Sequence, residues 1–140
     1  MESTMLRIET YEGEGYRPLV DFGNWRVAYL RFIDELIPEN ITQMEKHLET
    51  DEVFVLLNGE AVLFIGEGEN LLGRVSCLKM EPHKVYVVEK ATWHTCVLDL
   101  DATILLVENQ DTGLANTEYI DIDVSTKKYI VENSKTLISG

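Results

Sequence analysis

The stretch from Gln43 to Ile65, QMEKHLETDEVFVLLNGEAVLFI, decides the fold class. Its two apolar runs, Glu52 to Leu57 and Ala61 to Ile65, are rich in Val, Leu, Ile and Phe, which favour β-strands. Asn58-Gly59-Glu60 separates the runs, and Asn-Gly is the strongest short-range hairpin signal because both residues tolerate positive φ. We therefore predict two strands joined as a hairpin.

Working outward, short apolar runs between turn signals recur along the rest of the chain, whereas helical periodicity is weak. Further strands are expected at Trp25 to Ile33, Leu72 to Met80, Val85 to Val88, Trp93 to Leu98, Ala102 to Glu108 and Tyr119 to Val124. A run of about eight short strands predicts an all-β jelly roll or barrel. We expect one domain over residues 1–140, with a barrel core from about 22 to 124. Residues 125–140 begin with a plausible helix cap and are expected to form a short helix or an arm that packs on a neighbour.

The charge balance argues against two classes of partner. The 140 residues include 12 basic and 25 acidic side chains, for a net charge of −13, which repels nucleic-acid phosphates and anionic lipid headgroups. No apolar run is long enough to span a bilayer or to form a signal peptide, so we expect no membrane partner and a cytoplasmic location. The two cysteines, Cys77 and Cys96, are too few for a disulfide framework and are expected to be buried thiols.

The histidines limit any metal site to a small set of ligands. The chain has three, at positions 47, 83 and 94, so an imidazole site must be completed by carboxylates. Glu45 and His47 are two residues apart, and in a strand such residues project from the same face; Glu52 follows closely enough to fold back towards them. The alternative is that Glu45 and His47 face solvent while Met44 and Leu48 point inward.

The same residues resemble the first motif of the cupin superfamily, in which His-any-His is followed by Glu and then Gly. Here the motif begins with Glu45-Lys46-His47. Glu52 follows after four residues and Gly59 after a further six, so the second histidine, the glutamate and the glycine of the motif are kept in register. Glu45 stands where the first histidine would be. This resemblance covers Gln43 to Glu108 and implies a cupin-type double-stranded β-helix.

The second cupin motif, proline, glycine, histidine and asparagine, matches less well. In Glu89-Lys90-Ala91-Thr92-Trp93-His94 the histidine remains, but Glu89 and Ala91 replace the proline and glycine, and Leu98 takes the asparagine position. The resemblance implies one divalent metal held by Glu45, His47, Glu52 and His94. A shell of two histidines and two carboxylates suits Mn, Fe, Zn or Ni. Loss of the metal is the alternative, since some cupins bind none.

Other residues near these motifs carry weaker signals. Thr92, His94, Cys96 and Leu98 share one face of an alternating strand, so Cys96 is expected beside the site, either as a reactive thiol or as a small buried hydrophobe. Trp93 should face the opposite side. His83 follows Pro82 in a turn-like segment and is assigned to the rim of the barrel.

Three functions remain open from the sequence. One is a metal-dependent enzyme of isomerase, lyase or dioxygenase type acting on a small polar metabolite; the second is a non-catalytic module that binds a sugar or another small molecule; the third is a structural barrel. An acidic pocket suits a neutral or cationic ligand, but the sequence does not place Arg26, Arg31 or Arg74 relative to it. Because an open barrel edge invites pairing, we also expect a homodimer.

Overall fold

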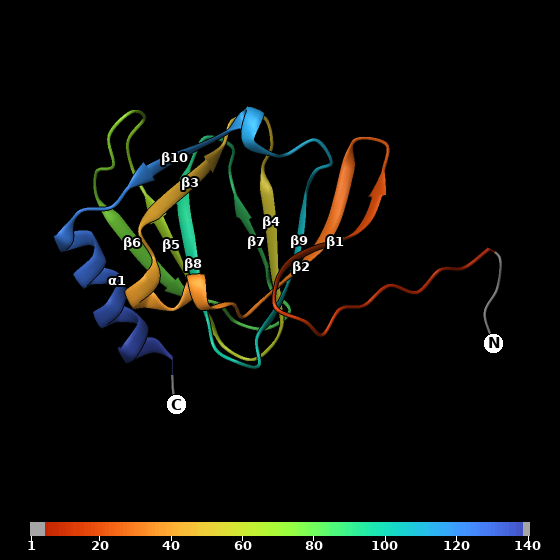
Figure 1. The fold of residues 1–140 in the computed structure, drawn as a ribbon, viewed down its shortest axis with the longest axis horizontal. Coiled ribbons are helices and arrows are strands. Elements are labelled where there is room, and N and C mark those ends of the chain that lie inside the picture. The colour runs from red at the N-terminus through yellow and green to blue at the C-terminus, as the bar shows by residue number, and fades with distance from the viewer. Residues whose placement is uncertain (1–4, 139–140) are drawn as a thin grey trace.

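The computed structural model describes residues 5–138, which form two β-sheets packed face to face with one helix against an outer face (Figure 1). The strands in this range are β1 (Gly15–Phe22), β2 (Trp25–Arg31), β3 (Gln43–His47), β4 (Glu52–Asn58), β5 (Ala61–Gly66), β6 (Val75–Lys79), β7 (Val85–Val88), β8 (Trp93–Leu98), β9 (Thr103–Asn109) and β10 (Thr117–Asp121). The 3-10 segments are η1 (Asp34–Leu36), η2 (Pro38–Asn40) and η3 (Leu114–Asn116), and the helix is α1 (Val124–Leu137). The sheet orders are β1-β2-β9-β4-β7 and β10-β3-β8-β5-β6, with antiparallel pairing, so the predicted all-β jelly roll is confirmed.

The predicted hairpin at Asn58-Gly59-Glu60 is wrong, although both strands and the turn are present. β4 pairs with β7 and β9 in one sheet, whereas β5 pairs with β6 and β8 in the other. The turn therefore carries the chain across the edge of the barrel. Gly59 has φ of 77°, and a Cβ there would lie 2.5 Å from the backbone nitrogen of Ala102, at the corner between β8 and β9. Asn-Gly specifies the backbone of the turn, but the strand partners come from distant segments.

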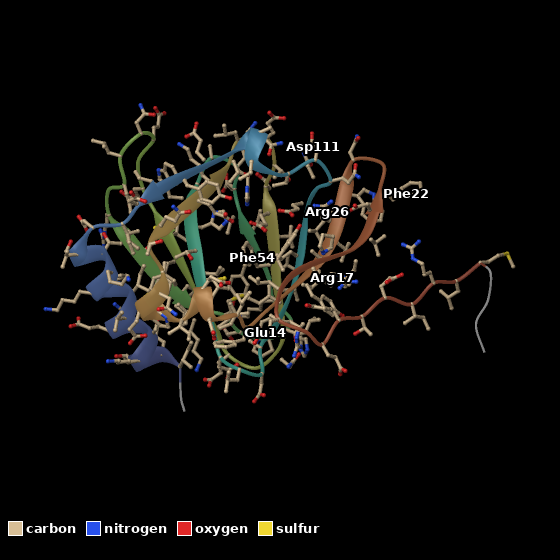
Figure 2. The ribbon with its side chains drawn as sticks, viewed as in Figure 1. Glu14, Arg17, Phe22, Arg26, Phe54 and Asp111 are labelled. Carbon is tan, nitrogen blue, oxygen red and sulfur yellow. The ribbon has the colours of Figure 1, made fainter. Side chains whose placement is uncertain are left out.

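Apolar side chains fill the space between the sheets. Phe54 and Leu56 of β4 and Ile104 of the neighbouring β9 face Leu63 of β5 and Leu98 of β8 in the other sheet, and all are at most 3 % exposed. Figure 2 shows Phe54 inside the barrel, whereas Phe22 lies at the far end of the β1-β2 pair. A cavity lined in part by Phe54 and Leu106 lies in the same interior.

Helix α1 covers the outer face of the sheet that contains β5. The side chain of Asp123 caps the helix by accepting a hydrogen bond from the backbone N–H of Thr126 at 2.8 Å. Ile130 packs against Val62 and Phe64 of β5, and all three are fully buried. The predicted C-terminal helix is thus present through Leu137, while residues 139–140 of that prediction lie outside the described residues.

Several predicted boundaries differ from the structure. The sheet begins at Gly15 rather than near residue 22, because β1 precedes the predicted core. A strand that contains Pro18 is possible here because β1 is at the edge of the sheet and its pairing shifts register beside the proline. β2 ends at Arg31, β6 begins at Val75 and β10 covers Thr117–Asp121. Within residues 5–138 no helix is both long enough and apolar enough to cross a membrane.

Candidate metal centre and pocket

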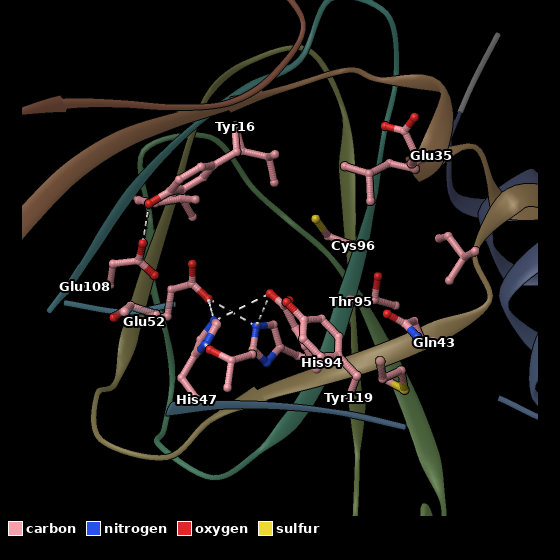
Figure 3. Close-up of a pocket in the computed structure, with 18 of the residues that line it drawn as sticks. Tyr16, Glu35, Gln43, His47, Glu52, His94, Thr95, Cys96, Glu108 and Tyr119 are labelled. Atoms are coloured by element: carbon pink, nitrogen blue, oxygen red, sulfur yellow. Dashed lines mark hydrogen bonds and ion pairs between the residues drawn. The ribbon is translucent and has the colours of Figure 1, made fainter. Parts of the chain in front are cut away.

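Three strands bring the four predicted metal ligands together inside the barrel. Glu45 and His47 project from the same face of β3, and Glu45 is paired directly with His94 on β8. Glu52 begins β4 in the facing sheet. One ligand atom from each residue lies within 4.8 Å of the others, and Figure 3 shows His47, Glu52 and His94 converging. The structure therefore brings all four predicted residues into one cluster, while their role as metal ligands stays a prediction.

The arrangement with Glu45 and His47 towards solvent is wrong for His47. Its ring is 7 % exposed and faces the interior, whereas Met44 on the opposite face is buried in the cluster beneath α1. Leu48, expected inside in that alternative, is 38 % exposed. Both faces of β3 are packed against other parts of the protein, one towards the barrel interior and one beneath α1. The alternation of its residues therefore could not show which face points into the barrel.

Glu52 lies at the centre of the cluster. Its Oε1 is 3.1 Å from Nε2 of His47 and 3.1 Å from Nε2 of His94. Glu45 is less tightly held, with Oε1 at 3.5 Å from His47 Nε2 and 3.8 Å from His94 Nε2. The side chains of His47, Glu52 and His94 are buried, whereas that of Glu45 is 38 % exposed. Glu45 therefore lies on the side of the cluster that opens to solvent.

Each imidazole is fixed in orientation through its other nitrogen. His94 Nδ1 is 2.9 Å from the backbone carbonyl oxygen of Thr92, which can only accept, so Nδ1 carries the proton. His47 Nδ1 is 2.9 Å from the hydroxyl of Thr117 on β10. Both Nε2 atoms therefore face the cluster. In metal centres, hydrogen bonds to the other ring nitrogen orient histidine ligands in the same way. Thr117 was not among the residues predicted from the sequence, since only the β3-β10 register places it opposite His47.

The carboxylates make the two histidines basic when no cation is bound. Burial by itself would lower the pKa of His47, but its hydrogen bonds to Glu45 and Glu52 outweigh burial and raise the pKa to about 10. Burial also opposes ionisation of His94, and Glu52 outweighs it to raise the pKa of that imidazole. For Glu52, burial is likewise overcome by the two histidines, which lower its pKa. In this state the carboxylates favour the protonated form of both imidazoles.

The donor set fits a divalent cation. Two imidazole nitrogens and two carboxylates converge on one point, three of the four side chains are buried, and the histidines are held from behind. Such groups are costly to bury unless they are paired with each other or with an ion. A cation would compete with protonation of the imidazoles, because it binds neutral imidazole and ionised carboxylate.

A cavity of about 670 Å³ opens in front of the cluster. One part of its wall is apolar, formed by Leu30, Leu36, Phe54, Cys96 and Leu106, and other parts carry polar side chains. Figure 3 shows Gln43, Thr95 and Tyr119 around the same space. A volume of this size accommodates one small molecule.

Glu108 is a pocket residue that the sequence analysis missed. It is buried on β9 and accepts a hydrogen bond from the Tyr16 hydroxyl. Burial and the nearby charge of Glu52 raise the pKa of Glu108 to about 7. The available signal was alternation: Ile104, Leu106 and Glu108 share the inward face of β9, so an acid follows two core residues.

The remaining sequence predictions near the site agree with the structure. Cys96 lines the pocket, and burial raises the pKa of its thiol, so it is a buried thiol rather than a reactive one. Trp93 faces the opposite side and packs beneath α1. His83 is exposed in a turn and takes no part in the cluster. Neither Cys77 nor Cys96 forms a disulfide; Cys96 is buried as predicted, whereas Cys77, away from the site, is only half-buried, so the predicted burial is wrong for Cys77.

Comparison with known proteins establishes the fold. No protein-family model matches the chain, and no curated protein matches it significantly. Among solved structures, it resembles a cupin-2 domain protein from Shewanella frigidimarina with a TM-score of 0.53 and 14 % identity, covering 71 % of this chain and 85 % of that one. It also resembles Pac13 from Streptomyces in complex with uridine, with a TM-score of 0.58 and 8 % identity over 87 % of this chain and 96 % of that one. Pac13 is a nucleoside dehydratase. The chain therefore has the cupin fold, as the first motif implied.

Proposed function

We propose that this protein is a metal-binding small cupin whose centre is formed by Glu45, His47, Glu52 and His94. One divalent metal, Mn, Fe, Zn or Ni, is bound there, and a small polar molecule binds in the cavity beside it. The observation that carries the proposal is the convergence of four ligand atoms within 4.8 Å on the wall of that cavity. A cytoplasmic location belongs to the same proposal.

We extend this proposal to a metal-dependent enzyme of isomerase, lyase or dioxygenase type. A bound divalent cation supplies polarisation of a substrate oxygen. The chain's own residues supply the rest: Thr117 and the carbonyl of Thr92 orient the imidazoles, and the apolar wall around Phe54 excludes water from one side of the substrate. The carboxylates of Glu45 and Glu108 line the cavity and are available to exchange protons with a bound molecule.

Elemental analysis of protein purified without chelators or an affinity tag tests the metal centre. We expect about one equivalent of a transition metal per chain, lost in His47→Asn and His94→Asn. His83→Asn is the matched control, because His83 is exposed outside the cluster and its φ of 69° is one that Asn tolerates. A metal content near zero in the parent, even after reconstitution, would contradict the proposal. Binding of small molecules without conversion would leave a non-catalytic binding module.

We also propose that the protein is a homodimer that pairs through the outer face of the β1-β2-β9-β4-β7 sheet. The sheet register aligns Val27, Val107, Val53 and Val87 in one row and Tyr29, Leu105, Val55 and Val85 in the next. Val85 and Val87 are 66 % and 51 % exposed, and α1 covers the other sheet. Two chains, each of charge −13, avoid opposed carboxylates if they meet through these uncharged rows.

Sedimentation at micromolar concentration tests the homodimer. We expect the parent to sediment as a dimer and a Val85→Glu, Val87→Glu variant as a monomer, because each chain would then bring two charges into the contact. A parent that sediments only as a monomer would remove the claim. The metal content should stay the same in both, because these side chains point away from the interior.

A further inference from the structure

Apart from the two histidines of the cluster, the acidic and basic side chains on the wall of the cavity are all acids. Four glutamates line it, at positions 35, 45, 52 and 108, together with the two histidines of the cluster. Among the lining residues there is no lysine or arginine. A phosphate or carboxylate ligand normally needs such a cation, because it must exchange its hydration for a charged partner when it is buried.

Arg26 contacts the cavity-lining residue Tyr16, but its guanidinium is paired with an acid outside the cavity. The guanidinium of Arg26 binds both carboxylate oxygens of Asp21, at 2.7 Å and 3.0 Å, on the outside of the β1-β2 pair. Its contact towards the cavity is a long hydrogen bond of 3.4 Å to the Tyr16 hydroxyl. Because Tyr16 donates to Glu108, that contact supports the cavity wall and leaves Arg26 paired with an acid.

The other basic residues near the site also point away from the cavity. Arg31 donates to the backbone carbonyl of Gly13 at 2.9 Å, and Arg74 is exposed in the loop before β6. Lys46, between two proposed ligands in sequence, projects to the opposite face of β3, where its Nζ lies 4.5 Å from the centre of the Trp93 ring. The structure thus answers the question that the sequence left open about the arginines.

A bound divalent cation does not reverse this balance. Its two positive charges are matched by the carboxylates of Glu45 and Glu52, while Glu35 and Glu108 contribute no positive charge in either protonation state. An anionic ligand would therefore meet further acids beside the metal centre, whereas hydroxyl and amine groups would find carboxylate acceptors beside an apolar wall.

We infer that the cavity takes a small hydroxyl- or amine-bearing molecule without net negative charge and discriminates against carboxylates and phosphates. This rests on the proposed function only in that the ligand occupies the same cavity. Glu35, on η1 at the cavity rim, and the buried Glu108 are the residues outside the metal centre that impose the discrimination.

Three probes that share one ring test the inference: cyclohexanol, cyclohexylamine and cyclohexanecarboxylate. Their affinities are measured from amide shifts in protein NMR spectra, once with a chelator present and once after loading with Zn²⁺. We expect the alcohol and the amine to shift residues that line the cavity, and the carboxylate to bind at least about tenfold more weakly in both forms. Because the chelator arm needs no metal, failure of the metal proposal is seen separately, in the elemental analysis.

Reversing one charge at the rim sharpens the test. Glu35→Lys should raise the affinity for the carboxylate by about tenfold and weaken binding of the amine. Glu39→Lys is the matched control, because Glu39 is exposed on η2, does not line the cavity and gives the same change in net charge. Equal or tighter binding of the carboxylate by the parent, no binding of the alcohol and amine, or equal responses in the two lysine variants would overturn the inference.

Discussion

Replacing Glu52 by glutamine removes the charge at the centre of the cluster while keeping the shape of the side chain. Glu52 is 5 % exposed, and its carboxylate accepts hydrogen bonds from both histidines at 3.1 Å; the variant and the parent are compared after chelator treatment, so that these hydrogen bonds are what the substitution removes. Removing one partner of a buried ion pair costs about 3–5 kcal/mol. Because Glu45 remains at 3.5 Å and 3.8 Å from the two imidazoles, we expect Glu52→Gln to lose about 3 kcal/mol, at the lower end of that range.

This loss should appear in urea unfolding at pH 6, where the parent's histidines are charged. In a domain of this size about 3 kcal/mol corresponds to a fall in Tm of roughly 10 °C. An NMR titration should also show a fall in the pKa of His47 from about 10, because Glu45 and Glu52 both raise that pKa and the variant keeps only Glu45. Glu89→Gln, at an exposed position outside the cluster, is the control. A loss below about 1 kcal/mol, together with an unchanged pKa of His47, would refute the assignment of Glu52 as the shared counterion.

Three further predictions concern pH and packing. The pKa of His47 is raised from 6.5 to about 10 in the folded state. In metal-free protein, protonated His47 therefore stabilises the fold fully below pH 6.5, and this stabilisation is lost as the pH rises through about 10. Urea unfolding across that range should show the decline in metal-free protein and not in metal-loaded protein. Ile130→Ala should cost about 2–5 kcal/mol in chemical denaturation by leaving a cavity beneath α1, with the metal content unchanged, and a loss of metal would contradict the separation of the two cores. Gly59→Ala should lower Tm by several degrees, because it combines a φ of 77° with a Cβ placed 2.5 Å from the backbone of Ala102; an unchanged Tm would show that the corner relaxes without cost.

The local pattern of the sequence determined the strands and most of the candidate site. Alternation and turn residues locate β4, β5, β8 and β9 to within a few residues, because these features depend on near neighbours in the chain. The spacing of Glu45, His47 and Glu52 similarly predicted which side chains could meet in one site, since residues two apart in a strand share a face. His94 was added by the resemblance to the second cupin motif, in which the histidine is kept.

Only the tertiary structure decided which strands are partners and which side chains meet. Asn58-Gly59 gave the right turn but the wrong pairing, because a turn's φ and ψ do not specify whether the chain stays in its sheet or crosses to the other. Thr117 and Glu108 enter the site through the β3-β10 register and the inward face of β9, which bring together residues far apart in sequence. The cavity's lack of lysine and arginine is also a tertiary property, because it depends on where long basic side chains find their partners.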